Sequence, residues 1–157
     1  MKECFWGIVF FIFLPSCYIS GGTHGSIQGY HYSVSKCVLE KAIWKTLKTN
    51  GNIFRDTVNK GFYNDSITYI TFKIKKGDLL GEYTIRYMGD DGDWKKSPNG
   101  CEIFICYVYD KNGVGGSEGD GGVKKLGDSL RDVLKLIESE LIDKVDVELG
   151  LKHVCVK

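Results

Sequence analysis

The chain has 157 residues, of which 43% are hydrophobic and 26% charged, so it is long enough for one globular domain with a sizeable core and does not resemble a disordered polymer. Its 21 basic and 20 acidic residues leave a formal charge of +1, and no polybasic stretch occurs along it. This balance lacks the positive charge typical of nucleic-acid-binding proteins, so no nucleic acid is expected among its partners.

The first predicted element is a signal peptide. Lys2 provides a short positive start, and Phe5–Leu14 is an uncharged run of ten residues that ends at Pro15. A helix that spans a bilayer needs about 20 apolar residues, whereas the core of a signal peptide needs about 7 to 15. The run is therefore predicted to direct export rather than to cross the membrane.

The segment that closes this run, Leu14-Pro15-Ser16-Cys17, resembles the lipobox of bacterial lipoproteins. The resemblance implies that residues 1–16 are removed, that Cys17 receives a diacylglycerol thioether, and that its new amino group is acylated. The implied partner is thus a membrane, reached through lipid on Cys17. By resemblance to lipoprotein sorting in enterobacteria, the absence of Asp after Cys17 favours the outer membrane over the inner. The alternative is ordinary secretion, with cleavage between Ser20 and Gly22.

Residues 17–29 predict a flexible linker, because Ser20–Gly29 holds four glycines among small polar residues. One α+β domain is then expected over residues 30–157. Its first helix is predicted over Ser33–Asn50, with Ser33 or Ser35 as the cap and Asn50-Gly51 as the stop. The residues of its apolar stripe are Val34, Val38, Leu39, Ala42, Ile43 and Leu47.

Three strands are expected after an irregular segment at 52–66. Ile67–Lys75 and Leu79–Met88 alternate between apolar and polar residues, and Cys101–Tyr109 is apolar on both faces and should be the most buried strand. Residues 89–100 are expected to be a polar excursion, Asp110–Gly113 a tight turn, and 114–122 a mobile glycine-rich loop.

A long second helix is predicted over Val123–Leu149, with Gly150 just past its end. Glu140 precedes Lys144 by four residues, an order that stabilises a helix by a few tenths of a kcal/mol, about 0.2 to 0.5. Leu151–Lys157 is either a short strand or a packed tail. The predicted fold is therefore α+β in the order α-β-β-β-α, with a small antiparallel meander and both helices on one face.

Two short segments, Gly21–Ile27 and Tyr109–Gly119, are similar to segments of small lipoproteins from Bacteroidetes-type bacteria. That family has no assigned activity. The resemblance implies a location in the cell envelope and implies no mechanism.

Four cysteines remain after Cys4 and Cys17 are set aside: Cys37, Cys101, Cys106 and Cys155. They permit two disulfides in an exported protein, or they are buried free thiols. Cys101 and Cys106 are not expected to pair with each other, because they would point to opposite faces of a regular strand. One could instead reach Cys37 and the other Cys155.

No metal or cofactor is expected. The chain has no Cys-x2-Cys and its histidines are scattered; His24 is a lone linker histidine. Asp90-Asp91-Gly92-Asp93 lacks the spacing of a calcium loop, so a solvated loop is the better interpretation. For catalysis, His31 and His153 are the only candidate bases in the domain. His153 and Cys155 would share one strand face, but no Gly-x-Ser-x-Gly occurs.

Aromatic residues suggest a binding surface, because Tyr69, Tyr83 and Arg86 could line an exposed sheet face. The leading hypothesis is a non-enzymatic lipoprotein that binds another envelope or toxin protein, as an immunity protein or inhibitor would. The competing hypothesis is a small periplasmic hydrolase or thiol enzyme that uses Cys155 or His153.

Overall fold

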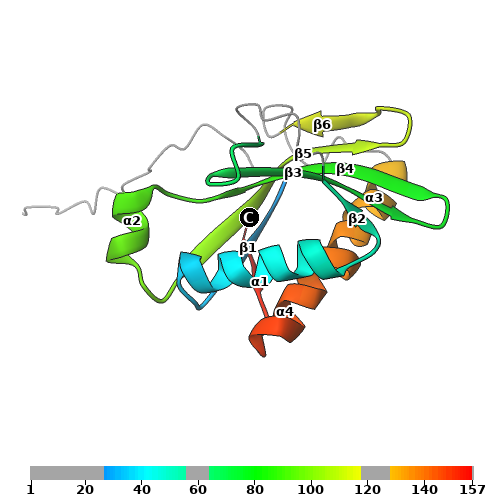
Figure 1. Ribbon diagram of the computed structural model, residues 1–157. Coiled ribbons are helices and arrows are strands. Elements are labelled where there is room, and N and C mark those ends of the chain that lie inside the picture. The colour runs from blue at the N-terminus through cyan, green and yellow to red at the C-terminus, as the bar shows by residue number, and fades with distance from the viewer. Residues whose placement is uncertain (1–26, 56–63, 118–127, 157) are drawn as a thin grey trace, which may run out of the picture.

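The computed structural model describes residues 27–55, 64–117 and 128–156 (Figure 1). It has an α+β fold with an open antiparallel sheet, as predicted. The strands are β1 (Gln28–Tyr32), β2 (Ile53–Phe54), β3 (Tyr69–Lys76), β4 (Leu79–Tyr87), β5 (Cys101–Asp110), β6 (Gly115–Ser117) and β7 (Val154–Val156). The helices are α1 (Lys36–Thr49), α2 (Asp91–Lys96), α3 (Asp128–Ile137), the π-helical η4 (Glu138–Ile142) and α4 (Asp143–Leu149).

The sheet is built on the antiparallel meander β2-β3-β4-β5, which three further pairings extend: β5 with β1, β1 with β7, and β5 with β6. Its order is β2-β3-β4-β5-β1-β7, and β6 also pairs with β5. β1 pairs with residues 101–105 of β5 and β6 pairs with residues 107–109, so the two strands share one edge of β5. The consecutive strands β3, β4 and β5 are the three predicted strands. They form the centre of the sheet, and the other strands pair outside them.

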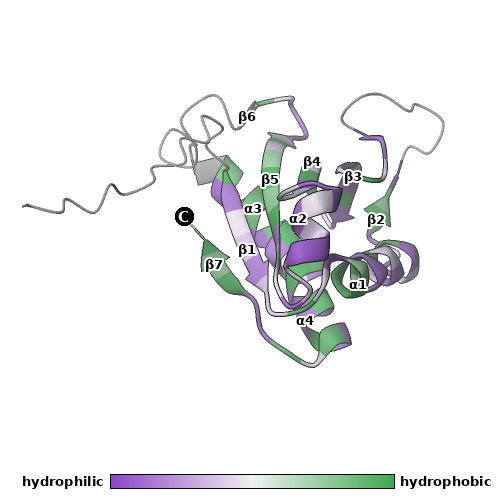
Figure 2. Ribbon diagram, turned by 90° about the vertical axis from the view of Figure 1, so that its left-hand side faces the viewer, coloured by the Kyte–Doolittle hydropathy of each residue, from purple (hydrophilic) through white to green (hydrophobic). Residues whose placement is uncertain are grey.

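The helices cover one face of this sheet. In Figure 1, α1, α3 and α4 lie together below the strands, and α2 lies apart at one end. Alternation puts one side of each central strand into the core, where Phe72 stacks on Tyr83 with ring centroids 5.6 Å apart. Figure 2 shows that β5 is largely hydrophobic and that α1 mixes hydrophobic and hydrophilic residues. The two predicted helical segments, α1 and α3 to α4, lie on one face of the sheet as expected, whereas α2 was not predicted.

The ends of both helical segments follow the predicted signals. The Oγ of Ser35 accepts a hydrogen bond from the backbone N of Val38 at 3.4 Å and caps α1. Gly150 takes φ of 65° after α4, a left-handed conformation that glycine adopts without steric cost. The stripe prediction holds for Leu39, Ala42, Ile43 and Leu47, which are buried, whereas Val38 is exposed.

Several elements depart from the prediction. β1 begins at Gln28, so the last residues of the predicted linker belong to the sheet. The excursion at 89–100 contains α2, and the segment after the Asp110 turn contains β6. The last helical segment passes through η4, where backbone bonds widen from the i−4 to the i−5 pattern. β7 resolves the C-terminal alternative as a short strand that pairs with β1.

Cys17 and His24 lie outside the described residues, as do the proposed signal peptide and residues 118–127. Among the described helices, none combines the length and the apolar character needed to cross a membrane.

Candidate functional site

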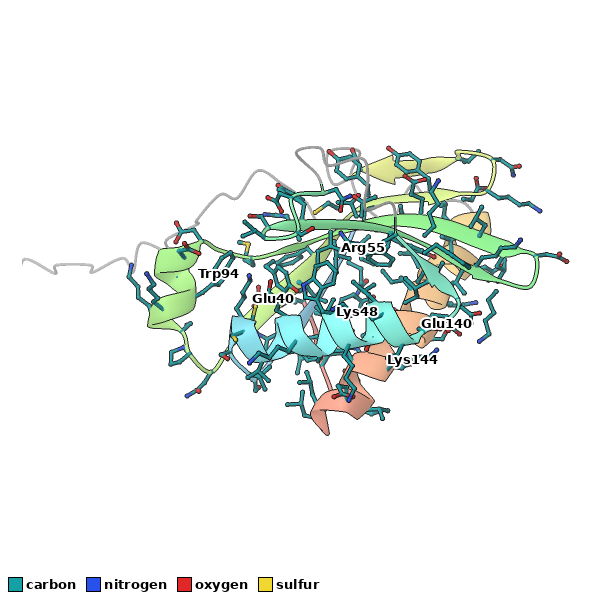
Figure 3. All side chains as sticks on the ribbon, viewed as in Figure 1. Glu40, Lys48, Arg55, Trp94, Glu140 and Lys144 are labelled. Atoms are coloured by element: carbon teal, nitrogen blue, oxygen red, sulfur yellow. The ribbon has the colours of Figure 1, made fainter. Side chains whose placement is uncertain are left out.

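A cavity of about 290 Å³ lies where α2 folds back over the end of the sheet. We call it the α2 pocket. Its lining comes from β1, the β4–α2 connection, α2, the α2–β5 connection and the start of β5: His31, Met88, Gly89, Asp93, Trp94, Ser97, Gly100, Cys101 and Glu102. Figure 3 shows Trp94 projecting from α2 toward the rest of the domain.

Local hydrogen bonds fix α2 in place although it has only six residues. Asp90 caps the helix, because its Oδ1 accepts from the backbone N of Gly92 at 2.7 Å and of Asp93 at 3.1 Å. The Asp93 carboxylate accepts in return from the Asp90 backbone N, which completes a capping box. These backbone donors hold the pKa of Asp90 below its usual value. The acidic run that invited a calcium interpretation therefore starts a helix.

Trp94 is locked against the sheet. Its Nε1 donates to the carbonyl oxygen of Met88 at 2.7 Å, and the backbone N of Met88 donates to the carbonyl of Glu102 at 2.9 Å. The Lys36 ammonium lies 4.5 Å from the indole centroid and 3.1 Å from the carboxylate of Glu40. One wall of the pocket is therefore an aromatic ring with a fixed orientation.

The opposite wall carries a histidine and a carboxylate. His31 of β1 faces Glu102 of β5 in the strand register, and His31 Nδ1 lies 3.3 Å from Glu102 Oε1. Both side chains are about one-third exposed, at 35% and 33%. Gly100 lies under the imidazole, where a Cβ would come within 3.3 Å of His31 Cε1. A larger residue at position 100 would therefore press against the imidazole and shift it by a few tenths of an ångström.

The Cys101 thiol in the pocket has low reactivity. Burial raises the pKa of Cys101 to about 11, and the nearby Lys36 only partly opposes this shift. At neutral pH the group is a neutral thiol, which is neither a nucleophile nor a good ligand for a soft metal. Among the described residues, no three His, Cys, Asp or Glu side chains gather closely enough to hold a metal ion.

A second cluster forms around His153 at the β7 edge. His153 Nδ1 lies 3.0 Å from Asp146 Oδ2, and both side chains are largely buried. The imidazole packs edge-on against Tyr30 at 5.1 Å between centroids, and Tyr30 is the register partner of Cys155. His153 and Cys155 therefore border the same tyrosine, and Asp146 orients the imidazole.

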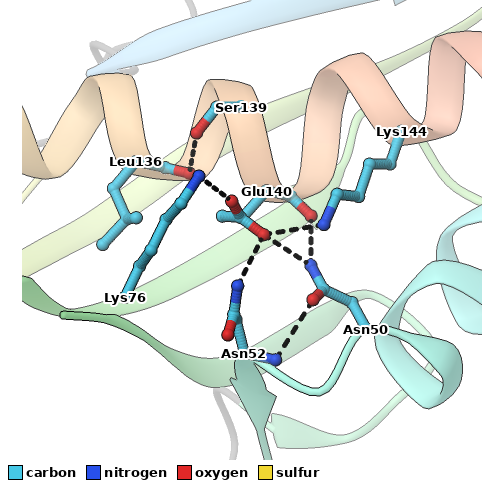
Figure 4. Close-up of polar contacts among 7 residues, drawn as sticks. All are labelled: Asn50, Asn52, Lys76, Leu136, Ser139, Glu140 and Lys144. Atoms are coloured by element: carbon cyan, nitrogen blue, oxygen red, sulfur yellow. Dashed lines mark hydrogen bonds and ion pairs between the residues drawn. The ribbon is translucent and has the colours of Figure 1, made fainter.

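A third cluster surrounds the carboxylate of Glu140 in η4 (Figure 4). The side chain is 4% exposed and accepts from Lys76 Nζ at 2.6 Å and Lys144 Nζ at 2.7 Å. The amides of Asn50 and Asn52 donate to it at 3.0 and 3.1 Å. Burial alone would raise the pKa of Glu140, but these four donors outweigh burial and lower it strongly. The contacts join the α1–β2 turn, the β3–β4 hairpin and η4, which is a structural role.

The predicted aromatic surface is only partly assembled. Tyr69 and Arg86 are register partners on the sheet face opposite the helices, and the Arg86 guanidinium lies 5.6 Å from the Phe104 ring. Tyr83 is not with them: it is fully buried on the core face, and its hydroxyl donates to the carbonyl of Val133 at 2.6 Å. Strand alternation separates position 83 from position 86, so Tyr83 does not belong to a binding surface.

The four cysteines of the domain, Cys37, Cys101, Cys106 and Cys155, are free thiols in the structure. Cys101 and Cys106 are buried in β5, whereas Cys37 and Cys155 are exposed on α1 and β7.

The sequence offered His31 only as a candidate catalytic base and gave no role to Trp94 or Glu102, so the α2 pocket that these three side chains line was not predicted. One signal was present, because Tyr30 and Tyr32 flank His31 in the alternation of a half-buried strand. No signal linked His31 to the segment around Trp94.

Comparison of the chain with models of protein families, with curated proteins and with solved structures found no match.

Proposed function

We propose that this protein is a membrane-anchored binding module of the bacterial cell envelope. Lipid on Cys17 holds it to the membrane, with the outer membrane favoured, and the domain binds another envelope protein or a toxin through the α2 pocket. The observation that carries the proposal is the preformed pocket itself, which has a fixed indole wall and a thiol that stays protonated. Such a cavity suits recognition better than nucleophilic catalysis.

The anchor is tested by the intact mass of the protein extracted from membranes. A chain that begins at Cys17 and carries acyl groups supports the proposal. An unlipidated chain that begins downstream of Cys17 overturns the anchor and makes the protein a secreted one.

The binding surface is tested by photo-crosslinking in cells. A photoreactive residue replaces Met88, which lines the pocket and is 47% exposed, and the control places it at Val147 on α4, which is 82% exposed. The proposal expects a discrete adduct from position 88 that is absent from position 147 and is lost when Trp94→Ala is added. Equal adducts from both positions would contradict a role for the pocket.

A second candidate function is a small periplasmic hydrolase or thiol enzyme. The observation that favours it is the Asp146 carboxylate on His153, since an imidazole oriented by a carboxylate can act as a general base, and the exposed Cys155 borders the same tyrosine, Tyr30. Native-state alkylation separates the two functions. An enzyme requires Cys155 to react faster than the exposed Cys37, and faster than Cys155 itself in the His153→Ala variant. Equal rates would exclude the thiol enzyme.

A further inference from the structure

The charges that line the α2 pocket are unbalanced. Asp93 and Glu102 contribute carboxylates and no lysine or arginine belongs to the lining. The lysines of α2, Lys95 and Lys96, are exposed outside it. The nearest cation, Lys36 over the Trp94 ring, is paired with Glu40, so the carboxylates of the lining favour a cationic ligand over an anionic one.

The Glu102 carboxylate can accept further hydrogen bonds. Within the described part of the chain, its side chain is bonded to His31 alone, at the long distance of 3.3 Å. A carboxylate can accept about four hydrogen bonds, so a donor placed in the pocket can bind without displacing His31. Asp93 is less available, because its Oδ2 already accepts from the Asp90 backbone.

The remaining walls are apolar and fixed. Trp94 presents its ring, and Met88 presents a thioether side chain that is 47% exposed. The indole already accommodates one cation, since the Lys36 ammonium lies 4.5 Å from its centroid and is neutralised by Glu40. Aromatic and thioether walls beside a carboxylate match a ligand that has a charged head and an apolar stem.

The volume fits a small ligand. About 290 Å³ lies near the lower end of ligand-pocket volumes, about 300 to 1,000 Å³, so one long side chain can be accommodated.

We propose that the α2 pocket binds an ammonium or guanidinium group on an apolar stem, with Glu102 paired to the charge and Trp94 and Met88 contacting the stem. The inference rests on the proposed function, because it takes the α2 pocket as the binding surface. The same chemistry has two sources: a lysine or arginine side chain of a partner protein, or a free organic amine.

The test follows the fluorescence of Trp94 in the full, membrane-extracted protein carrying Trp44→Phe, which removes the other tryptophan of the domain. The probes are Nα-acetyl-lysine methylamide, butylammonium and the uncharged Nα-acetyl-norleucine methylamide, all at constant ionic strength. We expect saturable changes with the charged probes and none with the norleucine compound. Binding of the lysine compound about tenfold or more tighter than butylammonium identifies a protein side chain as the source, because backbone contacts then add affinity; equal binding identifies a free amine.

Variants locate the charge contact. Glu102→Gln keeps the shape of the side chain and is expected to weaken binding by about tenfold to a hundredfold, the usual loss for a hydrogen bond to a charged group. Glu148→Gln, which removes a surface carboxylate on α4, is the matched control and is expected to leave binding unchanged. An unchanged affinity in Glu102→Gln, equal binding of the norleucine compound, or no saturation with either cation overturns the proposal. A pocket adduct from position 88 without amine binding would leave the proposed function standing and remove only this ligand class.

Discussion

Replacing Glu140 by Gln tests whether the cluster in η4 holds the helices to the sheet. The glutamine keeps the size of the side chain and one acceptor oxygen but loses the negative charge that Lys76 and Lys144 approach at 2.6 and 2.7 Å. The sequence alone suggested a helix-surface pair worth a few tenths of a kcal/mol, about 0.2 to 0.5. The structure predicts a larger stabilising free energy, because Glu140 is 4% exposed and also connects α1 to η4 through Asn50.

The expected loss of unfolding free energy lies between that of an exposed helix pair, about 0.2 to 0.5 kcal/mol, and that of a broken buried ion pair. Removing one partner of a fully buried ion pair costs about 3 to 5 kcal/mol, since the other charge is left without compensation. Here the two ammonium groups can turn toward water, because Lys76 and Lys144 are 58% and 44% exposed. We therefore expect Glu140→Gln to lower the free energy of unfolding by about 2 to 3 kcal/mol, which in a domain of this size lowers Tm by about 4 to 12 °C.

The assay is chemical denaturation at neutral pH, with Glu148→Gln as the control. That change removes the exposed pair between Lys45 and Glu148 at 2.6 Å, and it should cost about 1 kcal/mol or less. Because the folded state lowers the pKa of Glu140, its contribution is complete above the ordinary glutamate pKa of about 4.3 and is lost as pH falls below it. Glu140→Gln should therefore also flatten the fall in stability between about pH 5 and pH 3. Equal losses in the two variants, or an unchanged acid slope, would refute the reasoning.

Three further outcomes are expected. Gly81→Ala should destabilise the fold by about 1 to 3 kcal/mol in thermal unfolding, because its Cβ would meet Tyr83 and, at 2.6 Å, Val133, while Gly51→Ala, with open space around it, should be nearly neutral. Native-state alkylation should label the exposed Cys37 and Cys155 quickly and should reach Cys101 and Cys106 only after unfolding, so four fast labels would contradict the buried placement. In the Trp44→Phe background, Asp90→Ala should shift Trp94 emission to longer wavelength by loosening α2, whereas Asp91→Ala removes no cap. In Trp44→Phe alone, the same shift should appear as pH falls through the lowered pKa of Asp90, since the cap stabilises α2 only when the carboxylate is ionised.

Where local pattern and tertiary environment agree, the sequence was a good guide to the fold. β3 and β4 each bury the apolar side of their alternation, so the pattern around Ile70 and Ile85 identifies both the strands and their core sides, although Thr84 on the other face of β4 is buried as well. The turn at Asp110 was also predictable, because its Oδ1 accepts from the backbone N of Asn112 and of Val114, which is the usual role of Asp at this turn position.

The missed elements are short and depend on partners far along the chain. β1 has five residues with glycine and polar positions, and it is a strand because Tyr30 pairs with Ile103 of β5. β6 is Gly-Gly-Ser and has no strand propensity of its own, yet it completes the edge of β5. Glu140 was expected on a helix surface, and only the packing of η4 against the α1–β2 turn shows that its carboxylate is buried.

The α2 pocket could not be predicted for the same reason, since β1, α2 and β5 meet only in the folded sheet. Its geometry also bears on the choice between the two proposed functions. A catalytic group must be held within about 0.5 Å of its working position, whereas Cys155 lies on the three-residue edge strand β7, which pairs with β1 along one side. Short edge elements open most easily. The walls of the α2 pocket are held by the Trp94–Met88 hydrogen bond, the Met88–Glu102 ladder bond and the Asp90 cap. Rigidity is thus concentrated at the pocket rather than at the exposed thiol, which favours recognition over thiol catalysis.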